Sequence, residues 1–293
     1  MFLRRSRQKG VIQIKLFLIV ATSVCDNHCR FCVSDHLNKQ DQLPTDNKYI
    51  DLVQICSVIN KYGISPDDVV YFTGGEPTLH PELEQLVQYV SNYTNNIGLL
   101  TNGNRLANMY YLKGLIKSGL TSVLIPIYGY DEKTHDYVTQ KNGSFSDVMT
   151  AIENIVEIKK YTTITLRIRF VISRSTFHYI SRICTNLKSI STVDEVIFSY
   201  IHPSKIAVSN DELVPIMEFK DEFNCALQML FDRIGCQCSL RLLPQKDLVE
   251  LLDKSKRLQY YVRQRMLNKS VPCLDTADES IRIDLNPANS EIE

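Results

Sequence analysis

Three cysteines lie close together near the start of the chain. Three residues separate Cys25 from Cys29, and two separate Cys29 from Cys32. Thiolates are the usual ligands of iron–sulfur clusters, and three of them in one segment can hold three corners of a cluster. No fourth cysteine stands nearby to close the last corner, and an open metal position is typical of catalytic sites. The spacing therefore predicts a metal site that takes part in chemistry.

Zinc is the alternative occupant of this segment. His28 or His36 could supply a fourth ligand and close a structural knuckle of the kind that three cysteines and one histidine form. A closed structural site would have no need of the polar motifs that follow. An iron–sulfur cluster is therefore the preferred interpretation.

Two polar motifs follow the cysteines. The sequence Thr-Gly-Gly-Glu-Pro occupies residues 73–77, and Thr-Asn-Gly-Asn occupies residues 101–104. Gly74 and Gly75 would let the backbone approach a ligand closely, and Glu76 places a carboxylate directly beyond them. Glycines also serve in ordinary turns, so either motif alone is weak evidence. Both motifs end predicted strands, however, and polar groups at successive strand ends converge on one pocket mouth.

The elements that must position these groups alternate between β-rich and amphipathic runs. Strands are predicted at 11–21, 68–72, 96–101, 122–128, 162–172 and 194–201, and helices at 48–61, 81–92, 105–117, 145–159 and 177–188. This alternation is typical of βα units and of a parallel sheet. The fold class is therefore α/β. Periodicity alone leaves open whether the sheet is doubly wound or forms an incomplete barrel.

The pattern changes after the sixth strand. A long amphipathic helix is predicted at 211–234, a short apolar run at 236–242 and another helix at 247–267. We expect residues 1–205 to form the catalytic core. Residues 206–293 are predicted to form a mostly helical C-terminal extension that caps it.

The composition is that of an ordinary globular chain. The 33 Lys and Arg residues balance 33 Asp and Glu residues, so a nucleic-acid partner is not expected. Residues 4–9 and 11–21 resemble a secretory signal, but Gln13 and Lys15 interrupt the apolar run with strand-like alternation. No later segment is long enough for a membrane span. Nine cysteines with local spacing fit reduced thiols, and we expect a cytoplasmic protein.

The three motifs in this order resemble the radical S-adenosylmethionine (SAM) superfamily over about residues 12–202. The resemblance implies a partial (β/α)6 TIM-like barrel that holds a [4Fe-4S] cluster and SAM. Reductive cleavage of SAM at such a cluster gives a 5′-deoxyadenosyl radical, which abstracts hydrogen from the substrate. An electron donor of the flavodoxin or ferredoxin type is implied as well.

The resemblance also implies roles for individual residues. Cys25, Cys29 and Cys32 would be the cluster ligands. The aromatic residue before the third cysteine would contact the adenine of SAM, and the Gly-Gly-Glu motif would bind its amino group. The candidate cofactor-binding residues are Phe31, Gly74, Gly75, Glu76, Asn102 and Arg169.

The fourth and fifth strands differ from the family pattern in one respect. Pro126 stands where many members offer a serine toward SAM. Arg167 and Arg169 could compensate, because alternation along a strand puts both on one face. On the inner face of a barrel an arginine would suit the carboxylate of SAM or of a substrate, whereas an outward pair would be solvated.

The substrate is predicted from a weaker likeness. Residues 135–137 and 143–145, His-Asp-Tyr and Gly-Ser-Phe, resemble segments of radical SAM enzymes that modify peptides, including maturases of His-Xaa-Ser peptides. A peptide or protein substrate is therefore the first prediction, and a small molecule or nucleotide-derived substrate is the alternative. From another class, the chain could be a zinc-binding module or a non-catalytic partner subunit.

Peptide maturases commonly carry a cysteine-rich extension for auxiliary clusters. Four cysteines follow residue 205 here, namely Cys225, Cys236, Cys238 and Cys273. They could hold an auxiliary cluster, although scattered cysteines more often act as small hydrophobic residues. The second interpretation is preferred.

Overall fold

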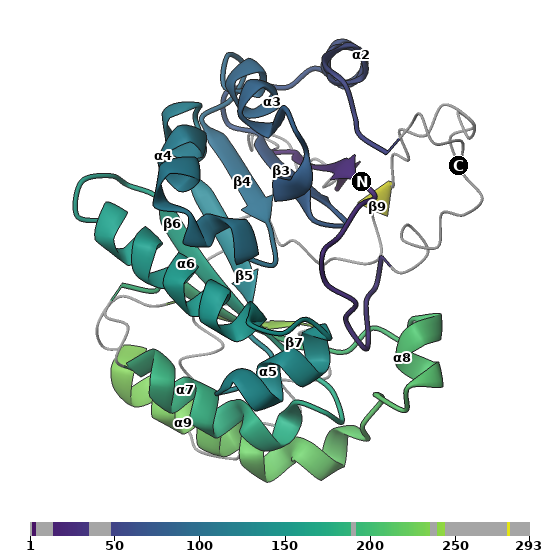
Figure 1. The fold of residues 1–293 in the computed structure, drawn as a ribbon, viewed down its shortest axis with the longest axis vertical. Coiled ribbons are helices and arrows are strands. Elements are labelled where there is room, and N and C mark those ends of the chain that lie inside the picture. The colour runs from purple at the N-terminus through teal and green to yellow at the C-terminus, as the bar shows by residue number, and fades with distance from the viewer. Residues whose placement is uncertain are drawn as a thin grey trace, which may run out of the picture.

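The computed structural model describes residues 2–3, 14–34, 48–188, 192–234, 239–243 and 280–281. Within these residues one twisted sheet runs through the molecule, and helices lie along its outer face (Figure 1). The predicted α/β class is confirmed.

The sheet contains nine described strands in the order β8-β7-β6-β5-β4-β3-β2-β1-β9. Strands β2 to β8 pair in parallel, whereas β1 is antiparallel to both β2 and β9. Because β8 and β9 form opposite edges, the described sheet is not closed, as in the predicted partial barrel. The strands are β1 (Phe2–Leu3), β2 (Leu16–Thr22), β3 (Val69–Gly74), β4 (Asn96–Leu100), β5 (Ser122–Pro126), β6 (Thr165–Ile172), β7 (Glu195–Tyr200), β8 (Ser239–Leu243) and β9 (Ser280–Ile281).

Helices connect the parallel strands. The described α-helices are α2 (Leu52–Tyr62), α3 (Leu83–Val90), α4 (Met109–Lys117), α5 (Glu132–Thr139), α6 (Ser144–Ile158), α7 (Ile180–Lys188), α8 (Lys205–Ser209) and α9 (Lys220–Ile234). Short 3₁₀ turns lie at Pro77–Leu79, Asn104–Ala107, Phe177–Tyr179 and Ile216–Phe219.

The main hydrophobic core lies between the sheet and these helices. Strand β6 shows why, since Leu166, Ile168 and Phe170 are buried against the helices and the residues between them face the other way. A smaller cluster covers the inner face of the sheet and consists of Leu16, Tyr71, Leu124 and Ile197. The inner face is therefore filled near the start of the strands, and the strand ends remain for the site.

Helix α5 was not predicted, because it is short and carries few apolar residues. Asp131 starts it, accepting a hydrogen bond from the backbone N–H of Thr134, whose side chain bonds back to the backbone of Asp131. The helix predicted at 105–117 is divided at Asn108, whose side chain accepts bonds from the first turn of α4.

The segment after residue 205 contacts the core directly. Strand β8 pairs with β7, and Glu222 of α9 accepts a hydrogen bond from the backbone of Ser181 in α7. The helix predicted at 211–234 begins only at Lys220, after the 3₁₀ turn that follows Pro215. The helix predicted at 247–267 lies outside the described residues, and the division into 1–205 and 206–293 stays a prediction.

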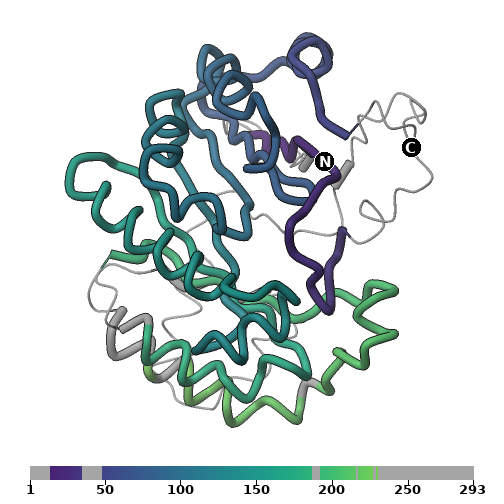
Figure 2. The backbone as a smooth tube through the Cα atoms, viewed as in Figure 1, coloured from purple at the N-terminus to yellow at the C-terminus, as the bar shows by residue number. Residues whose placement is uncertain are grey.

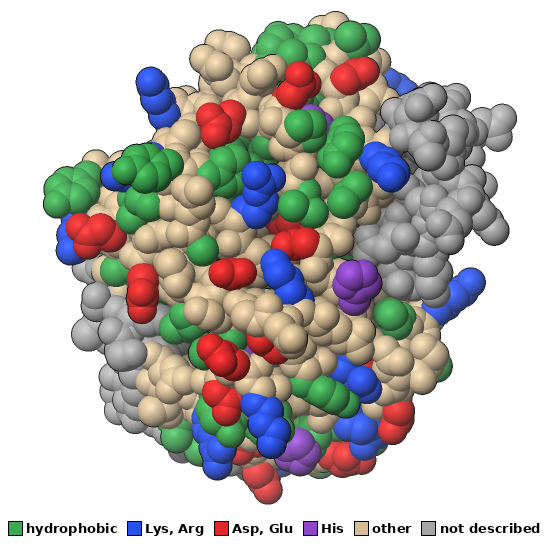
Figure 3. All heavy atoms as spheres, in the orientation of Figure 1, with side chains coloured by type: hydrophobic (Ala, Val, Ile, Leu, Met, Phe, Trp, Pro, Cys, Tyr) green, Lys and Arg blue, Asp and Glu red, His purple; other side chains and the backbone are tan. Residues whose placement is uncertain are grey.

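None of the described helices combines the length and the apolar character needed to cross a bilayer. Charged side chains of both signs are interspersed on the face shown in Figure 3.

Candidate functional site

The three clustered cysteines lie in the loop that leaves β2, which we call the cysteine loop (residues 23–34). Its backbone rests on the end of α5, because the N–H groups of His28 and Arg30 donate to the carbonyl oxygens of Thr139 and Val138 at 2.9 and 3.0 Å. The last carbonyl groups of a helix have no hydrogen-bond donor within the helix. These bonds therefore supply donors to the end of α5 and at the same time hold the loop against it.

The three thiols share one site. Burial, the largest cause, together with the charges of Glu76, Asp26 and Cys32, raises the pKa of the Cys25 thiol to about 12. Burial also raises the pKa of Cys29, with Cys32 and Cys25 adding to the rise. Each thiol is therefore within electrostatic reach of the others. Without a metal, Cys25 and Cys29 are protonated at neutral pH, and metal binding would displace those protons.

The donor set fits a cluster with three thiolate ligands. All three cysteines are free and partly exposed. His28, one candidate for a fourth zinc ligand, has an exposed side chain, and His36 lies outside the described residues. In the part of the chain that the structure describes, no group of three or more His, Cys, Asp or Glu side chains is arranged to hold a single metal ion.

Glu76 is buried beside the cysteine loop. Its Oε1 accepts from the backbone N–H and hydroxyl of Thr78 at 3.0 and 2.6 Å and from the hydroxyl of Thr101 at 2.6 Å. Its Oε2 accepts one bond, from the Asn102 N–H at 2.6 Å. Burial raises the pKa of Glu76, and these bonds oppose the rise. Among the described residues Oε2 accepts fewer bonds than Oε1, so Oε2 is the oxygen better able to accept a further donor.

Gly74 and Gly75 bring β3 against the cysteine loop. A Cβ atom at Gly74 would lie 2.2 Å from the carbonyl oxygen of Thr22, and one at Gly75 would lie 2.3 Å from that of Val24. Gly74 also has a φ of 136°, which residues with side chains rarely adopt. The two backbone segments are also hydrogen-bonded. The N–H of Gly75 donates to the carbonyl oxygen of Thr22, and the N–H of Glu76 donates to that of Val24. Both glycines are therefore needed for close backbone approach.

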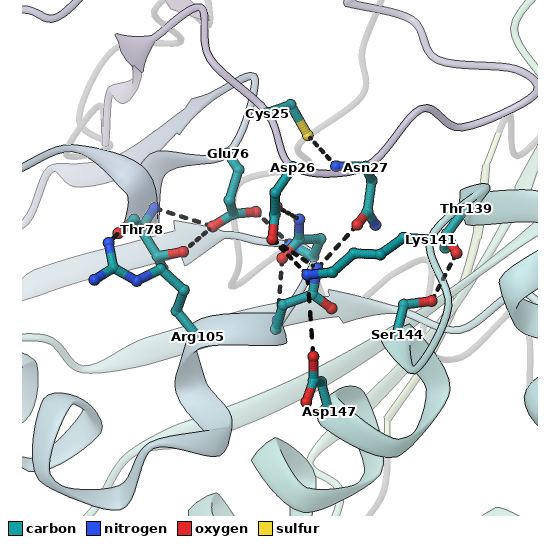
Figure 4. Close-up of polar contacts among 12 residues, drawn as sticks. Cys25, Asp26, Asn27, Glu76, Thr78, Arg105, Thr139, Lys141, Ser144 and Asp147 are labelled. Atoms are coloured by element: carbon teal, nitrogen blue, oxygen red, sulfur yellow. Dashed lines mark hydrogen bonds and ion pairs between the residues drawn. The ribbon is translucent and has the colours of Figure 1, made fainter.

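Asp26 connects the cysteine loop to two other segments. Its carboxylate accepts from the side-chain amides of Asn102 and Asn104 at 2.7 and 3.1 Å and from Lys141 Nζ at 2.6 Å. Burial alone would raise the pKa of Asp26, but the bonds from Lys141 and the amides outweigh it and lower the pKa. In Figure 4 the side chain of Lys141 extends between Asp26 and Asp147. The side chain of Asn102 is thus committed to the protein.

Phe31 is packed within the protein. Only 4% of the side chain is exposed, and its ring meets that of Tyr128 edge-on at 5.4 Å between centroids. Burial raises the pKa of Tyr128 well above its usual value, Cys29 and Cys32 add to the rise, and Arg169 opposes it. Tyr128 therefore lies near both the cysteines and Arg169.

Arg167 and Arg169 lie on the inner face of the sheet. Arg167 pairs with Glu195 at 3.2 Å, donates to Ser122 at 3.1 Å and lies over the ring of Tyr71. These partners belong to the filled base of the inner face. Arg169 lies two residues closer to the strand ends, so it is the better placed of the two for a ligand.

The His-Asp-Tyr and Gly-Ser-Phe segments have a structural explanation. Asp136 of α5 accepts from the N–H of Gly143, the hydroxyl of Ser144 and the N–H of Phe145, at 2.6, 2.7 and 2.9 Å. These bonds cap the start of α6. His135 is 1% exposed and accepts from the N–H of Tyr128 through Nδ1.

A second anchor joins the cysteine loop to the segment after β7. Arg30 Nε donates to Glu212 at 2.5 Å, and the side-chain amide of Asn210 donates to the Arg30 carbonyl oxygen at 2.7 Å. Glu212 also accepts from Ser173 and Ser175 in the loop after β6. Figure 2 shows the cysteine loop reaching the segment around α8.

The sequence pattern predicts the three cysteines as cluster ligands, which stays a prediction, but it does not single out Asp26, Lys141 or Glu212. The position of Asp26 between Cys25 and Cys29, two candidate ligands, could have marked it as a residue of the site. No sequence pattern marks Lys141 or Glu212, because they lie 115 and 182 residues along the chain from their partners Asp26 and Arg30.

A family model described as "Radical SAM superfamily" matches residues 19–169, more than half of the chain. Two curated relatives are a probable GTP 3′,8-cyclase of Thermoplasma volcanium, 30% identical over 125 residues, and a 7,8-dihydro-6-hydroxymethylpterin dimethyltransferase of Methanocaldococcus jannaschii, 29% identical over 125 residues. Each match covers 42% of this chain, but only 36% and 24% of the relatives' own lengths.

Two solved structures have a similar fold. One is anSMEcpe with bound AdoMet, at 21% identity and a TM-score of 0.53 over 77% of this chain and 60% of that chain. The other is Streptococcus suis SuiB bound to the precursor peptide SuiA, at 14% identity and a TM-score of 0.57 over 78% of this chain and 48% of that chain.

Proposed function

Because the chain belongs to the radical SAM superfamily and is a radical SAM enzyme, we propose that its substrate is a small molecule of the nucleotide or pterin class. The observation that carries this proposal is the pair of curated relatives, whose names specify a GTP cyclase and a pterin methyltransferase. The alternative substrate of the sequence prediction is thus better supported than the peptide or protein that ranked first.

The segments that suggested a peptide substrate support this change. Asp136 and residues 143–145 form a helix cap, and His135 is buried within it. Their residue types are therefore explained by folding, and they carry no information about the substrate. SuiB resembles the chain at only 14% identity, which bears on the fold alone.

The superfamily uses a [4Fe-4S] cluster and SAM, which together supply a 5′-deoxyadenosyl radical for hydrogen abstraction. In our proposal Cys25, Cys29 and Cys32 bind the cluster. Glu76 Oε2 accepts an N–H of the SAM amino group, and the backbone at Gly74 and Gly75 keeps that carboxylate in place.

The remaining assigned residues would shape the pocket. Phe31 and Tyr128 would present an apolar wall that excludes water near the adenine. Arg169 would offer a guanidinium group to a carboxylate or a phosphate, and a phosphate is the anionic group of a nucleotide. Asn102 would contribute through its backbone and through Asp26, because its side chain is occupied there.

The test is 5′-deoxyadenosine formation by the anaerobically reconstituted protein with SAM and a strong reductant. Nucleoside triphosphates, pterins and a peptide library are supplied in separate reactions. We expect a nucleotide or pterin to stimulate formation, and deuterium from the labelled substrate to enter 5′-deoxyadenosine. Stimulation by peptides alone would restore the peptide prediction, and a loaded cluster without SAM cleavage under any condition would contradict both.

The electron donor belongs to the same proposal. A flavodoxin or ferredoxin would supply the single electron in the cell. Such a protein should replace the chemical reductant in this assay.

A further inference from the structure

Asp26 and Lys141 form an ion pair beside the first cysteine. The Lys141 Nζ to Asp26 Oδ2 distance is 2.6 Å, and about a quarter of each side chain is exposed, 27% and 26%. Lys141 comes from the turn between α5 and α6. Asn102 and Asn104 hold the same carboxylate from the end of β4. Three contacts from two other segments thus define where the Asp26 carboxylate lies.

The pair is close enough to act on the cluster ligands. Asp26 directly follows Cys25 in the chain, so the ion pair is attached next to the first proposed cluster ligand. The N–H of Asn27 points at the Cys25 sulfur at 3.5 Å. Lys141 neutralises Asp26, so the two charges act on the thiol as a nearly balanced pair.

We propose that the Asp26–Lys141 pair sets the reduction potential of the cluster by keeping the charge beside Cys25 balanced. The inference rests on the proposed function because it requires the cluster. Reduction adds one electron, and hence one negative charge, to the cluster. An unbalanced negative charge nearby disfavours that electron, and an unbalanced positive charge favours it.

A purely mechanical role makes a different prediction. If the pair only held the loop in place, removal of either partner would break the same contact. Both substitutions would then disturb the cluster in the same direction. A charge-balancing role requires shifts of opposite sign, so the two roles can be distinguished.

The experiment is a redox titration of the reconstituted holoprotein without SAM, followed by electron paramagnetic resonance at low ionic strength, where charges are least screened. Lys141→Met should shift the midpoint potential to more negative values. Asp26→Asn, which is nearly isosteric, should shift it to more positive values. The double variant should return close to the wild-type potential.

Two matched controls complete the series. Lys141→Arg keeps the charge and should keep the wild-type potential. Asp147→Asn removes the other carboxylate near Lys141, at 4.0 Å, but this one faces the lysine from α6 and not from the cysteine loop. It should shift the potential by less than Asp26→Asn does.

Several outcomes would overturn the inference. These are equal potentials in all variants, shifts of one sign in both single variants, or a shift for Lys141→Arg as large as that for Lys141→Met. If the single variants bind no cluster but the double variant does, charge balance is supported. If all three variants lose the cluster, the pair has a mechanical role and the inference is overturned. Wild-type protein that binds no cluster would contradict the proposed function instead.

Discussion

At the scale of single residues, Cys29 is the proposed cluster ligand whose removal tests the site most directly. Cys29→Ala should abolish cluster binding, because the two remaining thiols cannot hold three corners of a cluster. Iron and acid-labile sulfide should fall to background and no 5′-deoxyadenosine should form. Cys56→Ser is the matched control, since Cys56 lies on α2 and donates to Tyr89. A full cluster in Cys29→Ala would refute the ligand assignment.

We propose that Glu76 both stabilises the fold and binds SAM. Glu76→Gln keeps an acceptor for Thr78 and Thr101 but turns an N–H2 group toward the Asn102 N–H. Losing a hydrogen bond to a charged group costs about 1.5–3 kcal/mol. We expect that loss in unfolding free energy from denaturant titration and a comparable loss of SAM affinity. Thr101→Val should reduce stability but leave SAM affinity near wild type; equal SAM affinity in Glu76→Gln would remove Glu76 from the SAM site.

His135 makes the stability of the protein depend on pH. Burial lowers the pKa of His135 from 6.5 to about 4. Between these values the unfolded chain binds a proton that the folded protein does not, so the free energy of unfolding falls as the pH drops from 6.5 to 4 and is flat above 6.5. The loss should reach about 3 kcal/mol, since one pKa unit corresponds to 1.36 kcal/mol.

The measurement is urea unfolding of cluster-free protein across this pH range. His135→Asn supplies an amide oxygen that can replace Nδ1 as the acceptor for the Tyr128 N–H, and it does not titrate. Its stability should therefore vary less with pH than that of the wild type. An unchanged pH dependence would show that other groups are responsible.

At the scale of elements, α5 and α6 form a corner on which the cysteine loop rests. Asp136 holds this corner by capping α6. Asp136→Ala should cost about 1–2 kcal/mol, as expected for the loss of a helix cap. Thermal unfolding would measure it, and amide hydrogen exchange should increase at Gly143 and Phe145. Ser146→Ala, on the same helix, is the control; unchanged protection at the two amides would contradict the capping role.

Helices and strands with a clear apolar period could be predicted, whereas this corner could not. Strands β3, β4 and β5 and helix α6 begin within two residues of the expected positions, because buried residues repeat along each. Helix α5 has no such period and depends on Asp131, on Asp136 and on its contact with the loop. The three cysteines could be predicted as cluster ligands because metal ligands are defined by residue type and short spacing. The role of Lys141 could not be predicted, because the sequence does not show which distant residue a given lysine pairs with.

At the scale of the whole molecule, Arg30 and Glu212 join segments 182 residues apart. Glu212 is 1% exposed, and removing one partner of a buried pair typically costs about 3–5 kcal/mol. Arg30→Met should therefore lower the free energy of unfolding by about 3 kcal/mol, because Arg30 keeps some exposure. Denaturant titration of cluster-free protein would measure it.

The control for this pair is Lys160→Met. Lys160 pairs with Glu157 on the surface, where solvent screens the interaction. Its substitution should change stability much less than Arg30→Met does. Equal effects would show that the link between the cysteine loop and residue 212 contributes little to the fold.

The contacts that hold the cysteine loop have one further consequence. The carbonyls of α5, Lys141 and Glu212 all bind the loop through contacts between protein atoms. We therefore expect much of the conformational entropy of the loop to be lost during folding and not during iron uptake. Such a preorganised loop would let cluster assembly follow folding and be repeated on the same molecule after oxidative damage.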